Sequence, residues 1–247
     1  MLKIVPQNRK GNGQLQLINR LRIIMLIEFK VTNFRSINST QTLSMVAASL
    51  NEENFKNNIF SSGIKDLQNL VKSAAIYGAN AAGKSNLIEA MDFVQNFVRD
   101  SAKEKQVGED INVIPFGLNT VNPTLPREFE LLFIANHILY EYGFALNNQK
   151  VVHEWLFAYP QGQGQLWFER IYDEETDEYN WEFNEKKLTG QRKFWKEITR
   201  HNALFISTAG MLNSVKLEPI VNWITNHLVV FTVKMYLSNV FNFLTIN

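Results

Sequence analysis

Residues 78–85 constrain the fold most, because they match the pattern G-x-x-x-x-G-K-[ST], which joins a strand to a helix through a glycine-rich loop. The matching residues and the next one along are Gly78, Ala79, Asn80, Ala81, Ala82, Gly83, Lys84, Ser85 and Asn86. Residues 71–77 are mostly small or apolar, which predicts a buried parallel strand before the loop. After the loop, apolar residues recur at helical spacing on one face: Leu87, Ala90, Met91 and Val94. The sequence therefore predicts a strand, a phosphate-binding loop and a helix.

The residue types in the loop suit a polyphosphate. Gly78 and Gly83 allow backbone conformations in which N–H groups point inward, and the start of the next helix adds further N–H groups. Lys84 is expected to reach the β- and γ-phosphates, and the Ser85 hydroxyl is expected to ligate Mg²⁺. We therefore expect nucleotide binding; the alternative is a glycine-rich turn that binds nothing.

Composition fits a folded chain in a reducing cytoplasm. Of 247 residues, 45% are hydrophobic and 20% are charged, so a core can form, and the net charge of +1 argues neither for nor against a nucleic-acid partner. Cysteine is absent, which excludes disulfides, and no apolar run is long enough to span a membrane. Residues 1–24 are basic and lack an apolar period; we interpret them as a disordered extension, or as sequence before a true start at Met25, with a basic arm for nucleic acid as the alternative.

Two further strands precede the loop, at residues 25–34 and 40–46, and the turn between them carries the run Asn-Phe-Arg-Ser at 33–36. This run, followed by a strand and then by the glycine-rich loop with Lys-Ser-Asn-Leu, resembles the N-terminal part of ABC-type ATPase heads. Within the branch that holds the SMC, RecF and OLD-like ATPases, the chain most resembles bacterial AAA-family proteins of the RloA or abortive-infection type. The resemblance implies that Arg35 lies near the bound phosphates of ATP; the alternative is an ordinary solvated turn residue.

The middle of the chain predicts an antiparallel sheet, which resembles the β-lobe of such heads. Strands are expected at residues 128–134, 138–146, 151–157 and 165–172, with a hairpin turn at 135–137 and an acidic hairpin loop at 173–178. Residues 188–228 predict short helices, with two apolar stripes: Phe194, Trp195 and Ile198, and Ile220, Trp223 and Ile224. The four histidines show no metal-ligand spacing and are interpreted as structural.

A second acidic motif is missing from the sequence. Hydrolysis by this class requires an apolar strand that ends in Asp-Glu, so that one carboxylate helps to hold Mg²⁺ and the other polarises the attacking water. No aspartate follows such a strand; if an acid of this chain does act in hydrolysis, Asp173 and Glu174 are the first candidates. A Ser-Gly-Gly signature segment is also missing from the sequence. The resemblance therefore covers residues 25–232 as the N-terminal part of an ATPase domain, and 233–247 form a divergent tail.

These observations predict an α/β fold, a P-loop NTPase of the ABC-type head with an antiparallel β-lobe. The resemblance implies a cytoplasmic, ATP- and Mg²⁺-binding ATPase whose hydrolysis drives a conformational switch in DNA transactions or phage defence. A homodimer and a nuclease or DNA partner are implied in the same way. Two alternatives stay open: a truncated, non-catalytic nucleotide-binding fragment, and a small P-loop kinase, for which no lid or substrate acid is visible.

Overall fold

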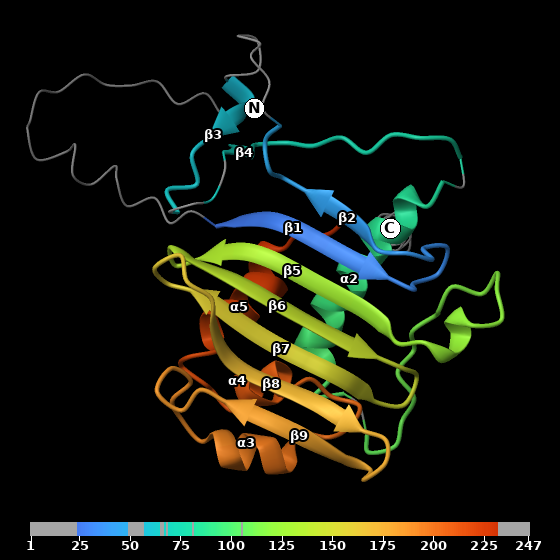
Figure 1. The fold of residues 1–247 in the computed structure, drawn as a ribbon, viewed down its shortest axis with the longest axis vertical. Coiled ribbons are helices and arrows are strands. Elements are labelled where there is room, and N and C mark those ends of the chain that lie inside the picture. The colour runs from blue at the N-terminus through green and yellow to red at the C-terminus, as the bar shows by residue number, and fades with distance from the viewer. Residues whose placement is uncertain are drawn as a thin grey trace, which may run out of the picture.

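A seven-stranded antiparallel sheet forms the centre of the computed structural model, which describes residues 24–48, 57–64, 67, 69–80, 82–104 and 106–231 (Figure 1). The strand order is β2-β1-β5-β6-β7-β8-β9. Their bounds are β1 Met25–Thr32, β2 Gln41–Ser44, β5 Arg127–Ala135, β6 Ile138–Leu146, β7 Val151–Tyr159, β8 Gln165–Asp173 and β9 Glu178–Phe183. The first two strands therefore continue the sheet that the sequence predicted as a separate lobe.

Alternation of side chains explains why these segments form one sheet with a single well-covered face. Inward positions carry buried aromatic and aliphatic residues, among them Phe29, Phe129, Leu131, Tyr142 and Phe144. The predicted β5–β6 hairpin is confirmed, and its two turn residues, Asn136 and His137, have φ values of 50° and 62°. Positive φ at both positions gives the backbone twist that a two-residue hairpin needs. The acidic run is also confirmed as the turn between β8 and β9.

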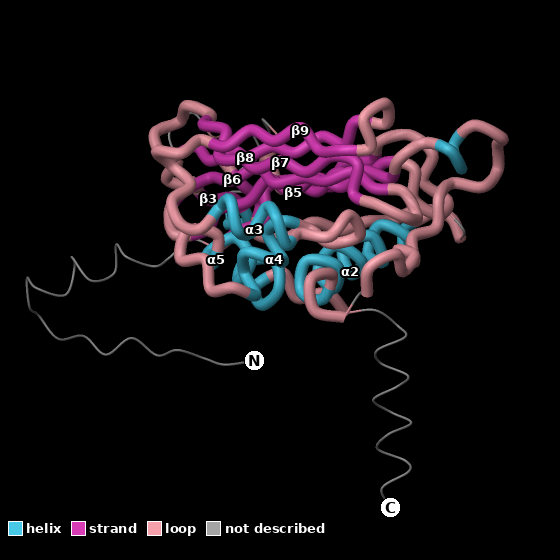
Figure 2. The backbone as a smooth tube through the Cα atoms, turned by 90° about the horizontal axis from the view of Figure 1, so that it is seen from below, coloured by secondary structure: helices cyan, strands magenta, loops and turns pink. Residues whose placement is uncertain are grey.

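Helices gather on one side of the sheet, as Figure 2 shows. They are α2 Lys84–Asp100, α3 Arg192–Ile198, α4 Phe205–Met211, α5 Glu218–Asn222 and the π-helix η3 Trp223–His227; a short 3₁₀ helix η2, Asn122–Thr124, precedes β5. The predicted apolar face of α2 is confirmed, since Ala90, Met91 and Val94 are buried and Leu87 packs against the core. The stripe of α3 was wrong in part, because Trp195 is buried whereas Phe194 and Ile198 are largely exposed.

The buried parallel strand predicted at residues 71–77 is wrong. Regular strand β4 covers Leu70–Val71 alone and pairs antiparallel with β3, Ile59–Phe60. Residues 72–80 are exposed, and Tyr77 is 94% exposed. A parallel strand is stable when strands flank it and helices cover both its faces. All strand pairings among the described residues are antiparallel, and none of them includes residues 72–77.

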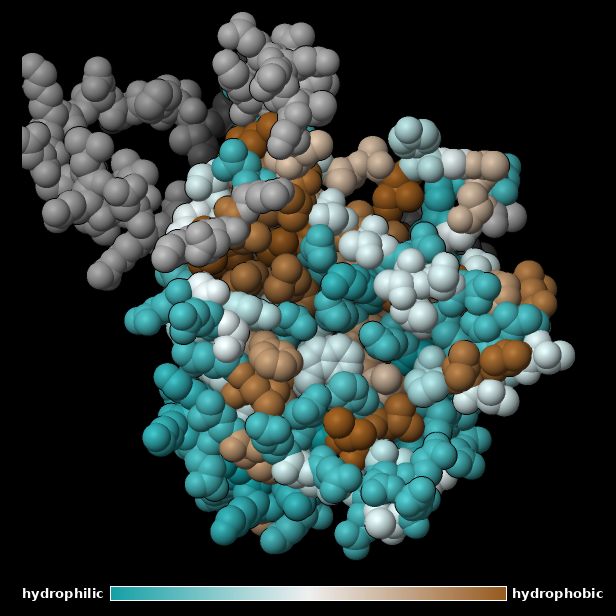
Figure 3. Space-filling view, viewed as in Figure 1, coloured by the Kyte–Doolittle hydropathy of each residue, from teal (hydrophilic) through white to brown (hydrophobic). Residues whose placement is uncertain are grey.

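A smaller apolar cluster lies where β1 and β5 meet the β3–β4 pair. Ile27, Leu70 and Ile134 form its buried centre, with partly buried apolar neighbours from β1, β3, β5 and β6 and from the loops beside β2 and β3. Figure 3 shows an apolar patch over this region, while the rest of the sheet face turned to the viewer is mostly polar. On that face Lys30 and Glu130 form an ion pair, with Lys30 Nζ 2.7 Å from Glu130 Oε1. The cluster therefore anchors the segment that leads into the glycine-rich loop.

A buried ion pair fixes α4 on the sheet. Glu154 of β7 and Arg170 of β8 are neighbours across the two strands, and both side chains are fully buried. Arg170 Nη2 lies 2.8 Å from Glu154 Oε2, and the Glu154 carboxylate accepts hydrogen bonds from the backbone N–H groups of Phe205 (2.8 Å) and Ile206 (3.1 Å). Negative charge at a helix N-terminus is favourable. Arg170 also donates to the carbonyl of Ala203, so one charged pair joins two strands to the start of α4.

Parts of the prediction lie outside the described residues. These are the extension up to residue 23, the tail from 233 to 247, Asp66 and Ala81 of the loop. Within the described part of the chain, none of the helices has the length and apolar character needed to cross a membrane.

Candidate phosphate-binding site

The glycine-rich loop connects the exposed segment after β4 to the first turn of α2. Gly83 is the residue before the helix and has φ 87° and ψ 1°, a left-handed conformation that glycine adopts without steric cost. Lys84, the first helical residue, folds back across the loop: its Nζ atom donates to the carbonyls of Gly78 at 2.8 Å and Ala79 at 2.7 Å. Ala82 N–H donates to the Ala79 carbonyl at 3.2 Å. The loop therefore curls around the lysine ammonium.

The N-terminus of α2 is open to an anion. No side chain caps its first N–H groups, and its first turn holds no acidic residue. The first N–H groups of a helix lack the usual intrahelical partners, and together with the helix dipole they favour a negative group. In α2 the N–H of Asn86 already donates to the Gly83 carbonyl at 3.0 Å, so the groups before it are the donors considered. Because α2 has 17 residues, its dipole is fully developed. This donor set fits the phosphate groups that the motif predicts.

The β1–β2 turn packs directly against the loop. Asn86 Nδ2 donates to Ser36 Oγ at 2.5 Å. A Cβ atom at Gly83 would lie 3.3 Å from the same hydroxyl, which is a tight contact. Glycine at position 83 is thus favoured twice, by its positive φ and by the approach of Ser36. Ser36 belongs to the Asn-Phe-Arg-Ser run, but the sequence did not predict this contact.

Asn33 explains why this turn has a defined position. It has φ 55° and is buried, and its side-chain amide donates to the carbonyls of Asn122 at 2.7 Å and Leu125 at 2.9 Å. Its Oδ1 atom accepts from Phe116 N–H at 3.0 Å. Asparagine tolerates the left-handed region better than most residues. One side chain therefore ties the turn to the segment that precedes β5.

Arg35 lies next to the loop, where its guanidinium forms an ion pair with Glu89 of α2. Its own backbone has φ 52°, and its N–H donates to the Ile114 carbonyl at 3.0 Å. A depression of about 490 Å³ opens between the turn and α2. Its described lining residues are Phe34, Arg35, Ser85, Ile88, Glu89, Asp92, Phe93, Asn96, Asn112, Ile114 and Phe231. Arg35 therefore shares a depression with Ser85, the predicted Mg²⁺ ligand.

A second depression, of about 430 Å³, lies on the other side of the loop. It is lined by residues of the β1–β2 turn, by Ile76 and Tyr77 before the loop, and by the start of α2. Lys84 lines this depression, whereas Ser85 lines the first. Lys84, the predicted phosphate contact, and Ser85, the predicted metal ligand, are thus neighbours in sequence that line different depressions.

The candidate acids of the β8–β9 turn lie far from this site. Asp173 Oδ1 accepts from Glu175 N–H at 2.9 Å within the turn. Three strands, β5, β6 and β7, separate β8 from β1, whose turn carries Arg35. Glu89 is the acid that sequence reasoning missed. It follows Ser85 by four residues, which puts both side chains on one face of α2, and this spacing was the available signal.

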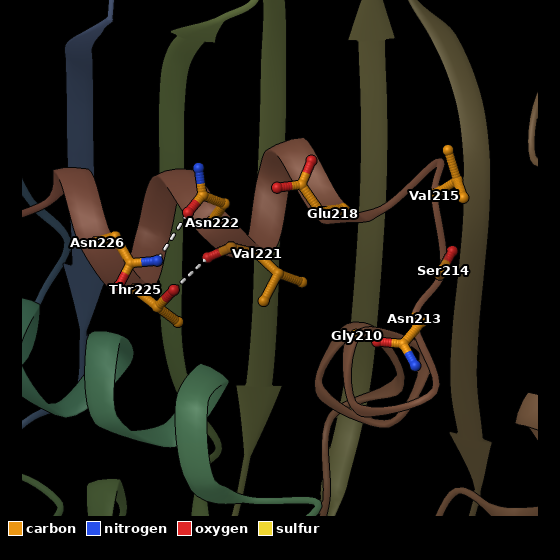
Figure 4. A pocket seen from close by; sticks show the side chains of 9 residues that line it. All are labelled: Gly210, Asn213, Ser214, Val215, Glu218, Val221, Asn222, Thr225 and Asn226. Carbon is orange, nitrogen blue, oxygen red and sulfur yellow. Dashed lines mark hydrogen bonds between the residues drawn. The ribbon is translucent and has the colours of Figure 1, made fainter.

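Other polar groups do not form a competing site in the described part of the chain. His153 Nε2 pairs with Glu169 Oε1 at 2.9 Å, and no group of three or more potential metal ligands was found among the described residues. A depression of about 380 Å³ lies between α4 and the α5–η3 segment (Figure 4). Its polar side chains bond locally: Asn226 donates to Asn222 at 2.7 Å and Thr225 to the Val221 carbonyl at 2.9 Å.

Comparison with known proteins identifies the family. Residues 73–228, more than half of the chain, match the family described as "AAA domain, putative AbiEii toxin, Type IV TA system". The searches of curated proteins and of solved structures found no match. The match begins just before the glycine-rich loop and runs through the sheet to the end of η3. The chain therefore belongs to this family of AAA-domain ATPases, and membership implies a P-loop NTPase. The described residues form a mixed α/β structure with a seven-stranded antiparallel sheet.

Proposed function

We propose that the chain binds ATP with Mg²⁺ at residues 78–86, and that hydrolysis drives a conformational switch in phage defence or DNA transactions. One observation carries the binding proposal: an uncapped 17-residue helix begins with Lys84, directly after a loop that curls around its ammonium group. A loop of this kind presents N–H groups and one mobile cation to a polyphosphate. Family membership supports the same reading.

Each residue of the site has a role in this proposal. Lys84 exchanges its two carbonyl acceptors for β- and γ-phosphate oxygens, while the N–H groups of the loop and of α2 bind the remaining oxygens. Ser85 is exposed at the mouth of its depression, so its hydroxyl is free to act as a metal ligand. Magnesium, when bound, supplies charge neutralisation between the phosphates. Arg35 adds a second cation beside Ser85.

The family description supports a biological role that we propose. A type IV toxin–antitoxin system implies an antitoxin partner, and we propose that the chain acts beside one in abortive infection, a form of phage defence. We further propose that relatives with a complete head act as homodimers, because ABC-type heads close their sites across two copies. The resemblance to the ABC-type heads supports a nuclease or DNA as a further proposed partner.

Calorimetric titration with Mg-ATP tests the binding proposal. Lys84→Ala removes the cation together with its hydrogen bonds to the carbonyls of Gly78 and Ala79, so we expect binding to fall below detection. Lys103→Ala, an exposed lysine after the end of α2, is the matched control and should bind like the parent. Equal ATP affinity in the parent and Lys84→Ala would overturn the assignment.

A second candidate function is nucleotide binding without hydrolysis. The carboxylates that line the depression beside Ser85 are those of Glu89 and Asp92, and Glu89 is engaged by Arg35. Neither follows a strand, whereas catalysis requires an acid aimed at the attacking water. Phosphate release by the parent, with Lys84→Ala as the contamination control, separates the two. Equal rates in both proteins would favour the non-catalytic function, and turnover that vanishes in Lys84→Ala would favour hydrolysis.

A further inference from the structure

Glu89 forms an ion pair with the guanidinium of Arg35. An incoming phosphate group would compete with Glu89 for this guanidinium. Glu89 and Ser85 are one helical turn apart on the same face of α2, and both line the depression that Arg35 enters. The ion pair therefore lies one turn beyond the hydroxyl that is expected to meet the metal. Arg35 is the cation among the described residues that line this depression, which also carries two carboxylates.

The backbone of Arg35 is fixed, whereas its side chain is held by contacts at the surface: the ion pair with Glu89, and the ring of Phe34, whose centre lies 5.6 Å from the guanidinium carbon. Hydrogen bonds between the backbones of Phe34 and Ile37, at 2.9 and 2.8 Å, close the turn on either side of it. Its side chain is 41% exposed and that of Glu89 is 37% exposed. Ion pairs with this exposure are weak because water screens them. A multiply charged anion at the loop can therefore draw the guanidinium away from Glu89 without moving the turn.

We propose that Glu89 is an internal counter-ion of Arg35 that competes with the phosphate groups of the nucleotide and so limits the affinity for ATP. The inference rests on the proposed function and extends it to a residue that regulates the site. Both cations at the loop are then satisfied internally before a nucleotide binds: Lys84 by the carbonyls of Gly78 and Ala79, and Arg35 by Glu89. Binding exchanges these partners for phosphate oxygens.

The test is a double-mutant cycle read by calorimetric titration with Mg-ATP. The proteins are the parent, Glu89→Gln, Arg35→Gln, and the double variant. Glutamine keeps the shape of Glu89 and removes its charge, so we expect affinity to rise about two- to fivefold in the parent background. In the Arg35→Gln background the same substitution should give a smaller gain, equal to the general loss of repulsion that Asp92→Asn gives, because no guanidinium is left to release. Thermal melts check that each variant is folded.

Asp92→Asn is the matched control, because Asp92 lines the same depression on the same helix. Neutralising it reduces general repulsion of the nucleotide, and this effect should be equal with and without Arg35. Unchanged or reduced affinity in Glu89→Gln, or an equal gain in the Arg35→Gln background, would overturn the inference while leaving nucleotide binding intact. Absence of ATP binding by the parent would overturn both the inference and the proposed function. Binding by the parent that is lost in Lys84→Ala keeps the proposed function, whatever the result for Glu89→Gln.

Discussion

Replacing Arg170 with methionine should destabilise the protein strongly, although Arg170 lies far from the glycine-rich loop. Its side chain is fully buried, pairs with Glu154 at 2.8 Å, and donates to the Ala203 carbonyl at 2.5 Å. Its guanidinium also lies 5.1 Å from the ring centre of Tyr179 and 5.4 Å from that of Trp181. Methionine fills much of the volume but leaves the Glu154 carboxylate buried without its counter-charge.

The magnitude follows from this orphaned charge. Removing one partner of a buried ion pair costs about 3–5 kcal/mol of the free energy of unfolding. For a chain of this size each kcal/mol lowers Tm by about 2–4 °C. Part of the carboxylate stays satisfied by the N–H groups of Phe205 and Ile206 and by the Tyr142 hydroxyl, at 2.8, 3.1 and 3.1 Å. We therefore expect a loss nearer about 3 kcal/mol than 5.

Urea denaturation followed by circular dichroism measures the effect. Glu154→Gln, which leaves Arg170 unpaired, should cost a similar amount. The double variant should be more stable than the sum of the two losses predicts, by about 1–3 kcal/mol, because no buried charge is left alone. Lys84→Ala is the control and should unfold like the parent. A loss below about 1 kcal/mol in Arg170→Met would refute the view that this pair holds α4 on the sheet.

Two further substitutions test the turn beside the loop and the buried tyrosines. Asn33→Ala should lower the free energy of unfolding by about 2–4 kcal/mol, because buried carbonyls lose their donor and alanine disfavours φ 55°. In urea titrations Asn33→Gly should recover about 1 kcal/mol of this loss, because glycine adopts positive φ without strain. Identical losses in the two variants would contradict the backbone part of this explanation. Burial raises the pKa of Tyr140 to about 12, so the folded state keeps a proton that the unfolded chain loses near pH 10. The contribution of protonated Tyr140 to the free energy of unfolding is therefore complete below pH 10 and falls as pH rises to 12, by up to about 3 kcal/mol. The free energies of unfolding of the parent and of Tyr140→Phe should diverge between pH 8 and 12. Parallel curves would be evidence against a raised pKa.

Sequence alone determined the features that depend on neighbouring residues. The glycine-rich motif located the loop and the start of α2, because the loop needs glycine and lysine at fixed spacing. The β5–β6 hairpin followed from two alternating segments and a short turn, and the apolar face of α2 followed from its 3.6-residue period. In each case the physical cause acts within a few residues, so a linear pattern is enough.

Tertiary structure decided what depends on partners distant in the chain. Residues 71–77 have the composition of a buried strand, but a strand exists only where another strand offers hydrogen bonds, and none of the described strands lies beside residues 72–77. Glu154 and Arg170 would each be expected at the surface from residue type, and they are buried because strand register brings opposite charges together beneath α4. The pairing of Arg35 with Glu89 arises for the same reason: a turn after β1 and a turn of α2 meet only once the sheet has folded against the helix.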